Sequence, residues 1–451
     1  MSFQRKVLNQ SLIYSFVSIG TILAGFISFP IWTRLLSPEE YGIYNLIIVS
    51  IGFLTTFSKA GLQKAVIRFY SEFAAGRNGR PISVYYSTML VGSLIAGCFF
   101  SVLFVALASV FQSTFSLGVS TKTLLLLIAV IVVMLSLNSV LISFFRVEQR
   151  AVSFTILSFI HRYGNIGASV LFAIGLKMGM VGLFIGQALI ETVVAVGCIA
   201  RLLWRKELFV KHFSLKFLRE ALSFGIPLMP VESSKWILAY MDRFVIQIFM
   251  GAAAVGFYSV GYNMTLYFST LLAAPFNLAI TPMYLDIWEK HGREKTTEFL
   301  NSVLDYFLML AIPLICAFSF LGGDLIDLLA SSKYHGASVV LPYLVIPIVL
   351  NASYTVFGAG LLIYKKTKLV MYYTFVAGGV NIALNFLLIP KFGLMGAAVA
   401  TLIAYTVLFG LTIVSASKYL RLSVNPKSVL GYVAASMVMM WMLSSLSWST
   451  M

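Results

Sequence analysis

Seven charged side chains stand inside apolar stretches that are long enough to cross a bilayer. They are Arg162, Glu191, Glu232, Lys235, Asp242, Arg243 and Asp305. An ionisable group is costly within a membrane unless it faces water, an opposite charge or a bound molecule, so each of the seven is a candidate functional residue. Arginine stays protonated and donates paired hydrogen bonds to phosphate, whereas a carboxylate can hold a proton or a cation. These residue types predict binding and ion exchange, with no catalytic residue among them.

Arg162 lies about ten residues into its apolar stretch, close to the bilayer midplane at a rise of ~1.5 Å per residue. Together with Lys235 it is our candidate for binding an anionic headgroup. Glu191 lies at a similar depth in the next stretch, so an alternative is a structural ion pair between Arg162 and Glu191. Glu191 is then either a proton or cation coupling site or only a counter-ion.

A single apolar stretch carries four more of these charges. Glu232 and Lys235 are three residues apart on one helical face and follow two prolines, Pro227 and Pro230, which predicts a kinked helix at a cavity. The alternative is a pair that neutralises itself so that the helix can insert. Asp242 and Arg243 follow near the predicted outer end, as an outer gate or an interfacial salt bridge.

Asp305 enters its stretch by only about one and a half turns, so it is either a coupling site or a solvated helix end. Several amides also fall within spans, and buried amides most often make hydrogen bonds between helices. These amides are Asn138, Gln187, Asn263, Asn277, Asn351, Asn381 and Asn385.

The composition shows what kind of molecule holds these charges. The 451 residues are 60% hydrophobic and only 11% charged, against roughly 25% charged in soluble proteins. This excludes a soluble protein and predicts an all-α polytopic membrane protein. Thirteen apolar runs are candidate spans, at 10–32, 42–60, 83–110, 123–145, 153–175, 180–200, 221–247, 254–284, 300–321, 338–363, 370–389, 394–416 and 428–446.

Basic residues alternate between the connections of these runs. Of the 32 Lys and Arg, 24 lie in one alternate set of connections and six in the other, where Arg243 is counted because it lies at the outer end of its span. The remaining two, Arg162 and Lys235, lie within spans. Because cytoplasmic loops retain Lys and Arg, this places the N-terminus in the cytoplasm and explains the net charge of +16 without nucleic acid. No GxxxxGK[ST] phosphate loop or Cys/His metal spacing is present, so we expect no cofactor and no metal.

The sequence also matches itself at an offset of 214 residues. Gly42 falls on Gly256 and Tyr44 on Tyr258, and Asn165 falls on Asn381 at an offset of 216. The same offset of 214 places Gly179 and Gly182 on Gly393 and Gly396. Six spans in each copy predict two six-helix lobes related by a parallel pseudo-twofold axis, plus a thirteenth helix.

We expect an N-lobe at 1–204, a basic cytoplasmic linker at 205–220, a C-lobe at 221–418 and the extra helix with the C-terminus at 419–451. Paired lobes commonly enclose a midplane site that opens alternately to either side. The organisation therefore favours a secondary transporter over an enzyme.

Two segments carry a resemblance to a known family. They are TRLLSPEEYGIYNL at 33–46 with AGLQKAVIRFY at 60–70, and Asp242-Arg243 with VGFY at 255–258. The chain resembles the polysaccharide biosynthesis, or oligosaccharide flippase (Wzx-like), family of the multidrug/oligosaccharidyl-lipid/polysaccharide exporter superfamily. The resemblance implies the MATE-like V shape of two six-helix lobes. Family members usually have twelve or fourteen spans, so thirteen is a departure.

The resemblance implies a flippase that moves an undecaprenyl-diphosphate-linked oligosaccharide from the inner to the outer leaflet for cell-surface polysaccharide synthesis. The implied setting is a prokaryotic cytoplasmic membrane. Membrane lipids, H⁺ or Na⁺, a polysaccharide polymerase and glycosyltransferases are the implied partners. Cation-coupled multidrug efflux is the alternative, and it would favour an acidic cavity. A membrane transferase would need an accessible His or acid constellation, and His161 is the only histidine found within a span.

Overall fold

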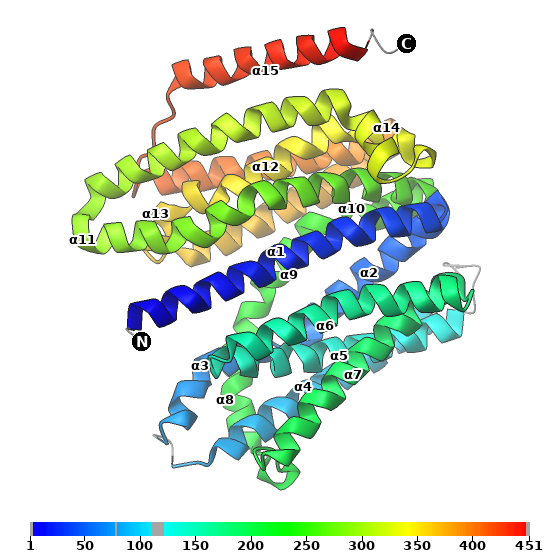
Figure 1. Ribbon diagram of the computed structural model, residues 1–451, viewed down its shortest axis with the longest axis vertical. Coiled ribbons are helices and arrows are strands. Elements are labelled where there is room, and N and C mark those ends of the chain that lie inside the picture. The colour runs from blue at the N-terminus through cyan, green and yellow to red at the C-terminus, as the bar shows by residue number, and fades with distance from the viewer. Residues whose placement is uncertain (1–2, 77–78, 111–120, 448–451) are drawn as a thin grey trace. The chain divides into compact units, whose positions relative to one another are not determined.

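The computed structural model describes the backbone of residues 3–76, 79–110 and 121–447, with the side chains of 3–15, 18, 22, 109–110, 121, 210, 271–279, 367 and 446–447 left aside. All regular structure in these ranges is helical (Figure 1), as the composition predicts. The chain forms two compact units. The first unit holds the residues up to Ala24 and Leu46–Ser233, and the second unit holds Gly25–Asn45 and the residues from Ser234 onward.

Each of the thirteen apolar runs falls on helical structure within the described ranges. Eight helices are long and apolar enough to cross a membrane. Two of these, at 280–329 and 368–417, cover 50 residues each and contain a sharp turn. The protein is therefore a multi-pass membrane protein. The pseudo-twofold arrangement of two lobes and the domain limits at 204, 220 and 418 stay predictions.

The helices of the first unit follow the expected spans closely. In chain order they are α1 (Phe3–Leu35) and α2 (Pro38–Ser58), which both units share, then α3 (Leu62–Ala74), α4 (Ile82–Val110), α5 (Thr121–Val147), α6 (Ala151–Val170), the π-helical turn η1 (Leu171–Gly175), α7 (Gly179–Trp204), η2 (Val210–His212), α8 (Leu215–Gly225) and η3 (Ile226–Leu228). The next helix, α9 (Met229–Tyr240), crosses the boundary between the units.

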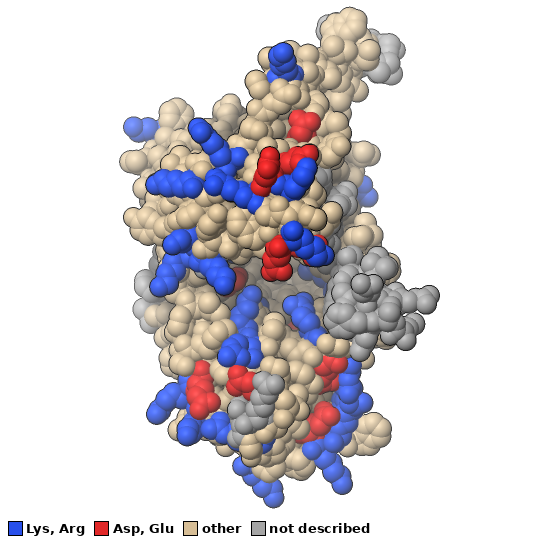
Figure 2. All heavy atoms as spheres, turned by 90° about the vertical axis from the view of Figure 1, so that its left-hand side faces the viewer, with Lys and Arg blue, Asp and Glu red and all other residues tan. Residues whose placement is uncertain are grey.

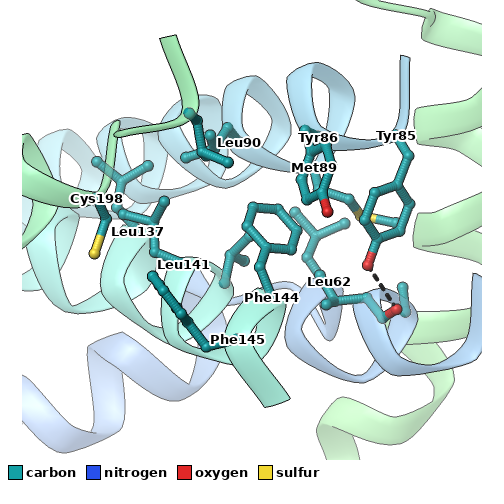
Figure 3. Close-up of a cluster of buried hydrophobic side chains, with 14 of the residues drawn as sticks. Leu62, Tyr85, Tyr86, Met89, Leu90, Leu137, Leu141, Phe144, Phe145 and Cys198 are labelled. Carbon is teal, nitrogen blue, oxygen red and sulfur yellow. Dashed lines mark hydrogen bonds between the residues drawn. The ribbon is translucent and has the colours of Figure 1, made fainter. Parts of the chain in front are cut away.

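Aromatic side chains from four of these helices build the core of the first unit. Tyr85 and Tyr86 of α4 pack with Leu62 of α3, Phe144 of α5 and Phe217 of α8, and Figure 3 shows the first four pointing toward one another. The Tyr85 hydroxyl donates a 2.8 Å hydrogen bond to the Val66 carbonyl. Phe217 lies in the predicted basic linker, so this part of the linker packs into the core.

The second unit continues with longer elements. These are α10 (Asp242–Met250), α11 (Ala252–Leu329), η4 (Ser332–Val340), α12 (Leu341–Phe357), α13 (Ala359–Ile363), α14 (Thr367–Ser417) and α15 (Pro426–Ser447). Both α11 and α14 turn back on themselves, because Gly292 (φ 74°) and Gly393 (φ 58°) adopt backbone angles that favour glycine. Tyr284 consequently packs in one cluster with Leu300, and Ala377 in one cluster with Ala404.

The hairpins α6–α7 and α14 pack alike at their turns. A Cβ on Gly182 would lie 2.6 Å from the Phe172 backbone, and one on Gly396 would lie 2.4 Å from the Leu388 backbone. The two contacts are related by the offsets of 214 and 216 that the sequence shows. The local geometry thus agrees with the internal repeat at this hairpin.

The predicted inner connections gather at one end of each unit. In the second unit the Trp288 ring lies 5.5 Å from that of Tyr364, which lies 5.0 Å from that of Tyr419, so three basic connections meet there. In the first unit Arg150 and Arg201 share Glu148, at 2.9 and 3.6 Å. Figure 2 faces the α11 turn of Figure 1 and shows Lys and Arg on this end of the second unit.

Candidate functional site

A buried carboxylate occupies the centre of the first unit. Glu191 of α7 is fully buried. Its oxygens accept hydrogen bonds from the amide nitrogens of Asn138 of α5 at 2.7 Å and Asn165 of α6 at 3.0 Å, and His161 Nε2 lies at 2.8 Å. The partner of Glu191 is thus His161 and not Arg162, so the alternative ion pair between Arg162 and Glu191 is not formed.

The amide oxygens of Asn138 and Asn165 are buried without hydrogen-bond partners. Both amides turn their donors toward Glu191, which is the orientation that an ionised carboxylate requires. His161 is a quarter exposed at its side chain. The cluster is therefore a buried carboxylate with a titratable neighbour that reaches the surface of the unit.

Arg162 lies on a polar face of α6. At about 100° per residue, the side chains of Thr155, Ser158, Asn165 and Ser169 fall within roughly 60° of Arg162. Its own side chain is exposed, and the described part of the chain gives it no ion pair. A lone arginine on a polar stripe near the middle of a helix that is predicted to span the membrane fits a water-filled or substrate-binding surface better than lipid.

The opposite side of α6 is apolar. Ile156 and Ile160 lie there and are 55% and 46% exposed. Tyr163 binds α1 through a 2.8 Å hydrogen bond from its hydroxyl to the Gly20 carbonyl, while His161 and Asn165 face α7. Each side of α6 therefore has a distinct environment, and Arg162 projects away from the side that is typical of lipid contact.

The prolines break the seventh apolar run as predicted. Instead of one helix, residues 215–250 form α8, η3, α9 and α10. Glu232 lies 3.9 Å from Lys64 of α3 in the first unit, and both side chains are about half exposed. Lys235 is also exposed, and no ion pair to it occurs among the described residues. Glu232 thus pairs with Lys64, which leaves Lys235 available as a cation.

Asp242 and Arg243 form a buried ion pair in the second unit. Both side chains are 1% exposed, and Arg243 Nη1 lies 3.0 Å from Asp242 Oδ1. The guanidinium carbon lies 4.4 Å from the Tyr262 ring centre and 5.0 Å from that of Tyr240. The Tyr258 hydroxyl donates a 2.6 Å hydrogen bond to Asp242. Desolvated cation–π contacts and charge-assisted hydrogen bonds both stabilise such a pair.

A chain of polar groups extends from this pair. Tyr258 Oη lies 3.3 Å from Thr401 Oγ1, the amide of Asn381 donates to Thr401 at 3.4 Å, and that of Asn385 donates to Asn381 at 2.9 Å. Asn381 thus bonds across the turn of α14, and Asn138 and Asn263 bond between helices as expected, whereas Asn385 bonds within its own helix. The side chain of Asn277 lies outside the described residues. The tyrosines were missed as partners, although Tyr258 and Tyr262 have the i,i+4 spacing of one helical face.

Asp305 has a structural role in the second unit. The Tyr432 hydroxyl of α15 donates a 2.9 Å hydrogen bond to Asp305 Oδ2. Four residues earlier, Asn301 exchanges two hydrogen bonds with Ser423, at 3.1 and 3.0 Å. These contacts fasten the start of α15 to α11.

Comparison with known proteins shows which family this chain matches. The family model described as polysaccharide biosynthesis protein matches residues 31–339. The chain belongs to this family. The match covers the segments at 33–70 and 242–258 that carry the resemblance. It therefore confirms the resemblance.

Relatives of this chain occur in archaea and in bacteria. A probable low-salt glycan biosynthesis flippase, Agl15 of Haloferax volcanii, is 22% identical over 85% of this chain and 77% of its own length. An uncharacterized membrane protein of Methanocaldococcus jannaschii is 26% identical over 205 residues, which are 44% of this chain. The chain spans only 39% of the length of that relative.

Solved structures share the fold. The lipid II flippase MurJ, in an inward closed conformation, superposes with a TM-score of 0.75 and 18% identity, over 96% of this chain and 93% of that one. An inward-facing multidrug resistance MATE transporter of the MOP superfamily gives 0.70 and 15%, over 90% and 97%. The all-α fold implied by the resemblance is thereby confirmed.

Proposed function

We propose that this protein is a flippase that carries a lipid-linked oligosaccharide from the inner to the outer leaflet, and that it is a transporter and not an enzyme. The observation that carries the proposal is Arg162, which has no ion pair among the described residues and lies on a polar stripe of α6, a helix that the sequence predicts to span the membrane. A phosphorylated headgroup is excluded from hydrocarbon, and a guanidinium that binds it lowers the barrier to crossing. The family match and the glycan flippase among its relatives support this substrate class.

The charge balance within each unit favours this function over multidrug efflux. Efflux of cationic drugs requires free carboxylates, but Glu191 is bound by His161 and two amides, and Asp242 is bound by Arg243. Arg162 and Lys235 remain without ion pairs among the described residues. Both side chains are positive, which is the sign that a diphosphate requires.

The linked sugar carrier is an undecaprenyl diphosphate in this proposal, and the setting is a prokaryotic cytoplasmic membrane with the N-terminus inside. The basic connections that gather at one end of each unit support this orientation. Glycosyltransferases would supply the substrate, and a polysaccharide polymerase would consume it. Glu191 with His161 is the proposed coupling element for H⁺.

The test measures glycan export in cells that depend on this protein. Arg162→Ala and Lys235→Ala should each abolish export at wild-type levels of inserted protein, because each removes a cation that binds phosphate. Arg219→Ala and Arg421→Ala serve as matched controls, since both residues are exposed cations outside the candidate spans, and they should export normally. Normal export by both of the first two variants would remove the proposed site.

A further inference from the structure

The hairpin α6–α7 carries an apolar groove on the side away from Arg162. It is lined by Ile156, Leu157 and Ile160 of α6 and by Val193 and Gly197 of α7, and its volume is about 370 Å³. Phe145 and Cys198 form its floor and also belong to the buried cluster of Figure 3. The groove lies wholly within the first unit.

Packing of small residues explains why the hairpin opens here. Near its turn the two helices touch backbone to backbone, since a Cβ on Gly186 would lie 2.4 Å from the Ser169 nitrogen. Further from the turn, Gly164 meets Ile190 at an ordinary 3.4 Å. At Gly197 nothing lies within 4 Å of the Cβ position. The helices therefore diverge toward the predicted cytoplasmic end, and the missing side chain of Gly197 leaves space between them.

A cation stands at that end of the groove. Arg201 lines it, with the guanidinium carbon 4.3 Å from the Phe145 ring centre and Nη2 3.6 Å from Glu148 Oε2. The side chain remains 24% exposed. Glu148 is already bound by Arg150 at 2.9 Å and by the Tyr86 hydroxyl at 2.8 Å, so it does not neutralise Arg201 alone.

The surrounding charge has the same sign. The segments 146–150 and 201–207, which meet at this end, carry five cations and two carboxylates: Arg146, Arg150, Arg201, Arg205, Lys206, Glu148 and Glu207. A negatively charged group is therefore attracted to the mouth of the groove. A hydrocarbon chain fits its interior, which is mostly apolar.

We propose that this groove binds one anionic phospholipid, with an acyl chain between α6 and α7 and the phosphate at Arg201. The dimensions favour a phospholipid over the polyprenyl substrate. From Arg201 to Val193 the groove extends for eight residues, about 12 Å at 1.5 Å per residue. That length holds part of an ordinary acyl chain but only a small part of a polyprenyl tail. Arg201 is the one cation that lines the groove itself, which suits a monoanionic phosphate better than a diphosphate.

The lipid site and the proposed headgroup site at Arg162 then lie on opposite sides of α6. The four groove-lining positions of α6, which are Ser153, Ile156, Leu157 and Ile160, centre about 170° from Arg162 at 100° per residue. A lipid bound in the groove fills the gap between α6 and α7 beside the pair of His161 and Glu191 without entering the polar side. Lipid binding here is independent of whether the protein is a flippase.

The experiment uses the full-length protein, delipidated in detergent and titrated with dioleoyl phosphatidylglycerol or dioleoyl phosphatidylethanolamine, with bound lipid counted by native mass spectrometry. Wild-type protein should retain one phosphatidylglycerol about tenfold more tightly than phosphatidylethanolamine, as one charge-assisted contact provides. Arg201→Gln should remove that preference. Gly197→Leu should lose the retained lipid, because the new side chain fills the groove.

Gly410→Leu is the matched control, since Gly410 is also an exposed helical glycine with nothing within 4 Å of its Cβ position. It should bind lipid as the wild type does. Gly197→Leu alters open space and leaves Arg201 in place, so it tests the groove even if Arg201→Gln weakens the fold. Equal retention by Gly197→Leu and wild type, equal affinity for both lipids, or displacement of phosphatidylglycerol by undecaprenyl phosphate at equal concentration would each overturn the proposal.

Discussion

Gly42 and Gly256 pack against each other reciprocally within the second unit. A Cβ on Gly42 would lie 1.8 Å from the Ala252 carbonyl oxygen, and one on Gly256 would lie 2.0 Å from that of Pro38. Pro38 and Ala252 are themselves 214 residues apart, as are the two glycines. Gly42 therefore meets the repeat equivalent of Pro38, while Gly256 meets Pro38 itself. A local twofold axis produces such a reciprocal contact. The contact between α2 and α11 thus has the local symmetry that the predicted repeat requires.

Substitution at this crossing should destabilise the protein strongly. Gly42→Ala and Gly256→Ala each place a methyl group into backbone, which neither helix can avoid by turning a side chain. Overpacking of this kind costs about 1–3 kcal/mol in the free energy of unfolding. Thermal unfolding in detergent measures the effect, with Gly410→Ala as the control in open space. Unchanged melting of both variants would show that the helices do not touch here.

Removing one member of the Asp242–Arg243 pair should destabilise the fold far more than replacing both members. Asp242→Asn leaves a buried guanidinium without its counter-ion, which costs about 3–5 kcal/mol. The double variant Asp242→Asn with Arg243→Met removes both charges and should recover most of that loss. A double-mutant cycle on unfolding free energies measures the coupling. Additive effects of the two substitutions would contradict the buried pair.

Glu191→Gln should uncouple activity from pH while leaving the protein folded. The glutamine keeps the size of the side chain and an acceptor for Asn138 or Asn165 but cannot take up a proton. The groups that face Glu191 are neutral amides on α5 and α6 and the titratable His161, with Arg162 adjacent on α6. Export measured from pH 6 to pH 8 should vary for the wild type and stay flat for the variant.

A matched comparison is His161→Gln, which keeps a hydrogen-bond donor to Glu191 but removes the imidazole. We expect its export to lose the same pH dependence. A pH profile identical to that of the wild type in both variants would exclude the cluster from coupling and leave it a structural element.

Asp305→Asn should loosen α15 and have little effect on export. The amide oxygen can still accept from the Tyr432 hydroxyl, but the hydrogen bond loses the contribution of the negative charge and weakens. Limited proteolysis of the segment before Pro426 reports the release of the helix, and Tyr432→Phe should behave similarly. Loss of export with unchanged proteolysis would instead make Asp305 a coupling residue.

The amino-acid sequence determined the class, the spans and the family. Low charge and long apolar runs leave no alternative to a bundle of membrane helices, and the offset of 214 located equivalent glycines before any contact was visible. Pro227 and Pro230 determined the break in the seventh run, since two closely spaced prolines remove backbone donors and clash with the preceding turn. These properties are local to the sequence and do not depend on how the neighbouring helices pack.

Tertiary structure alone decided the partners of the charges. Arg162 and His161 are adjacent in sequence, yet a step of 100° around α6 turns only His161 toward Glu191. Depth in the membrane could not distinguish them, because rotation of the helix depends on how its other sides pack, here through Tyr163 on α1. The tyrosines around Arg243 likewise come together only when α9, α10 and α11 are packed, which no spacing along the chain reveals.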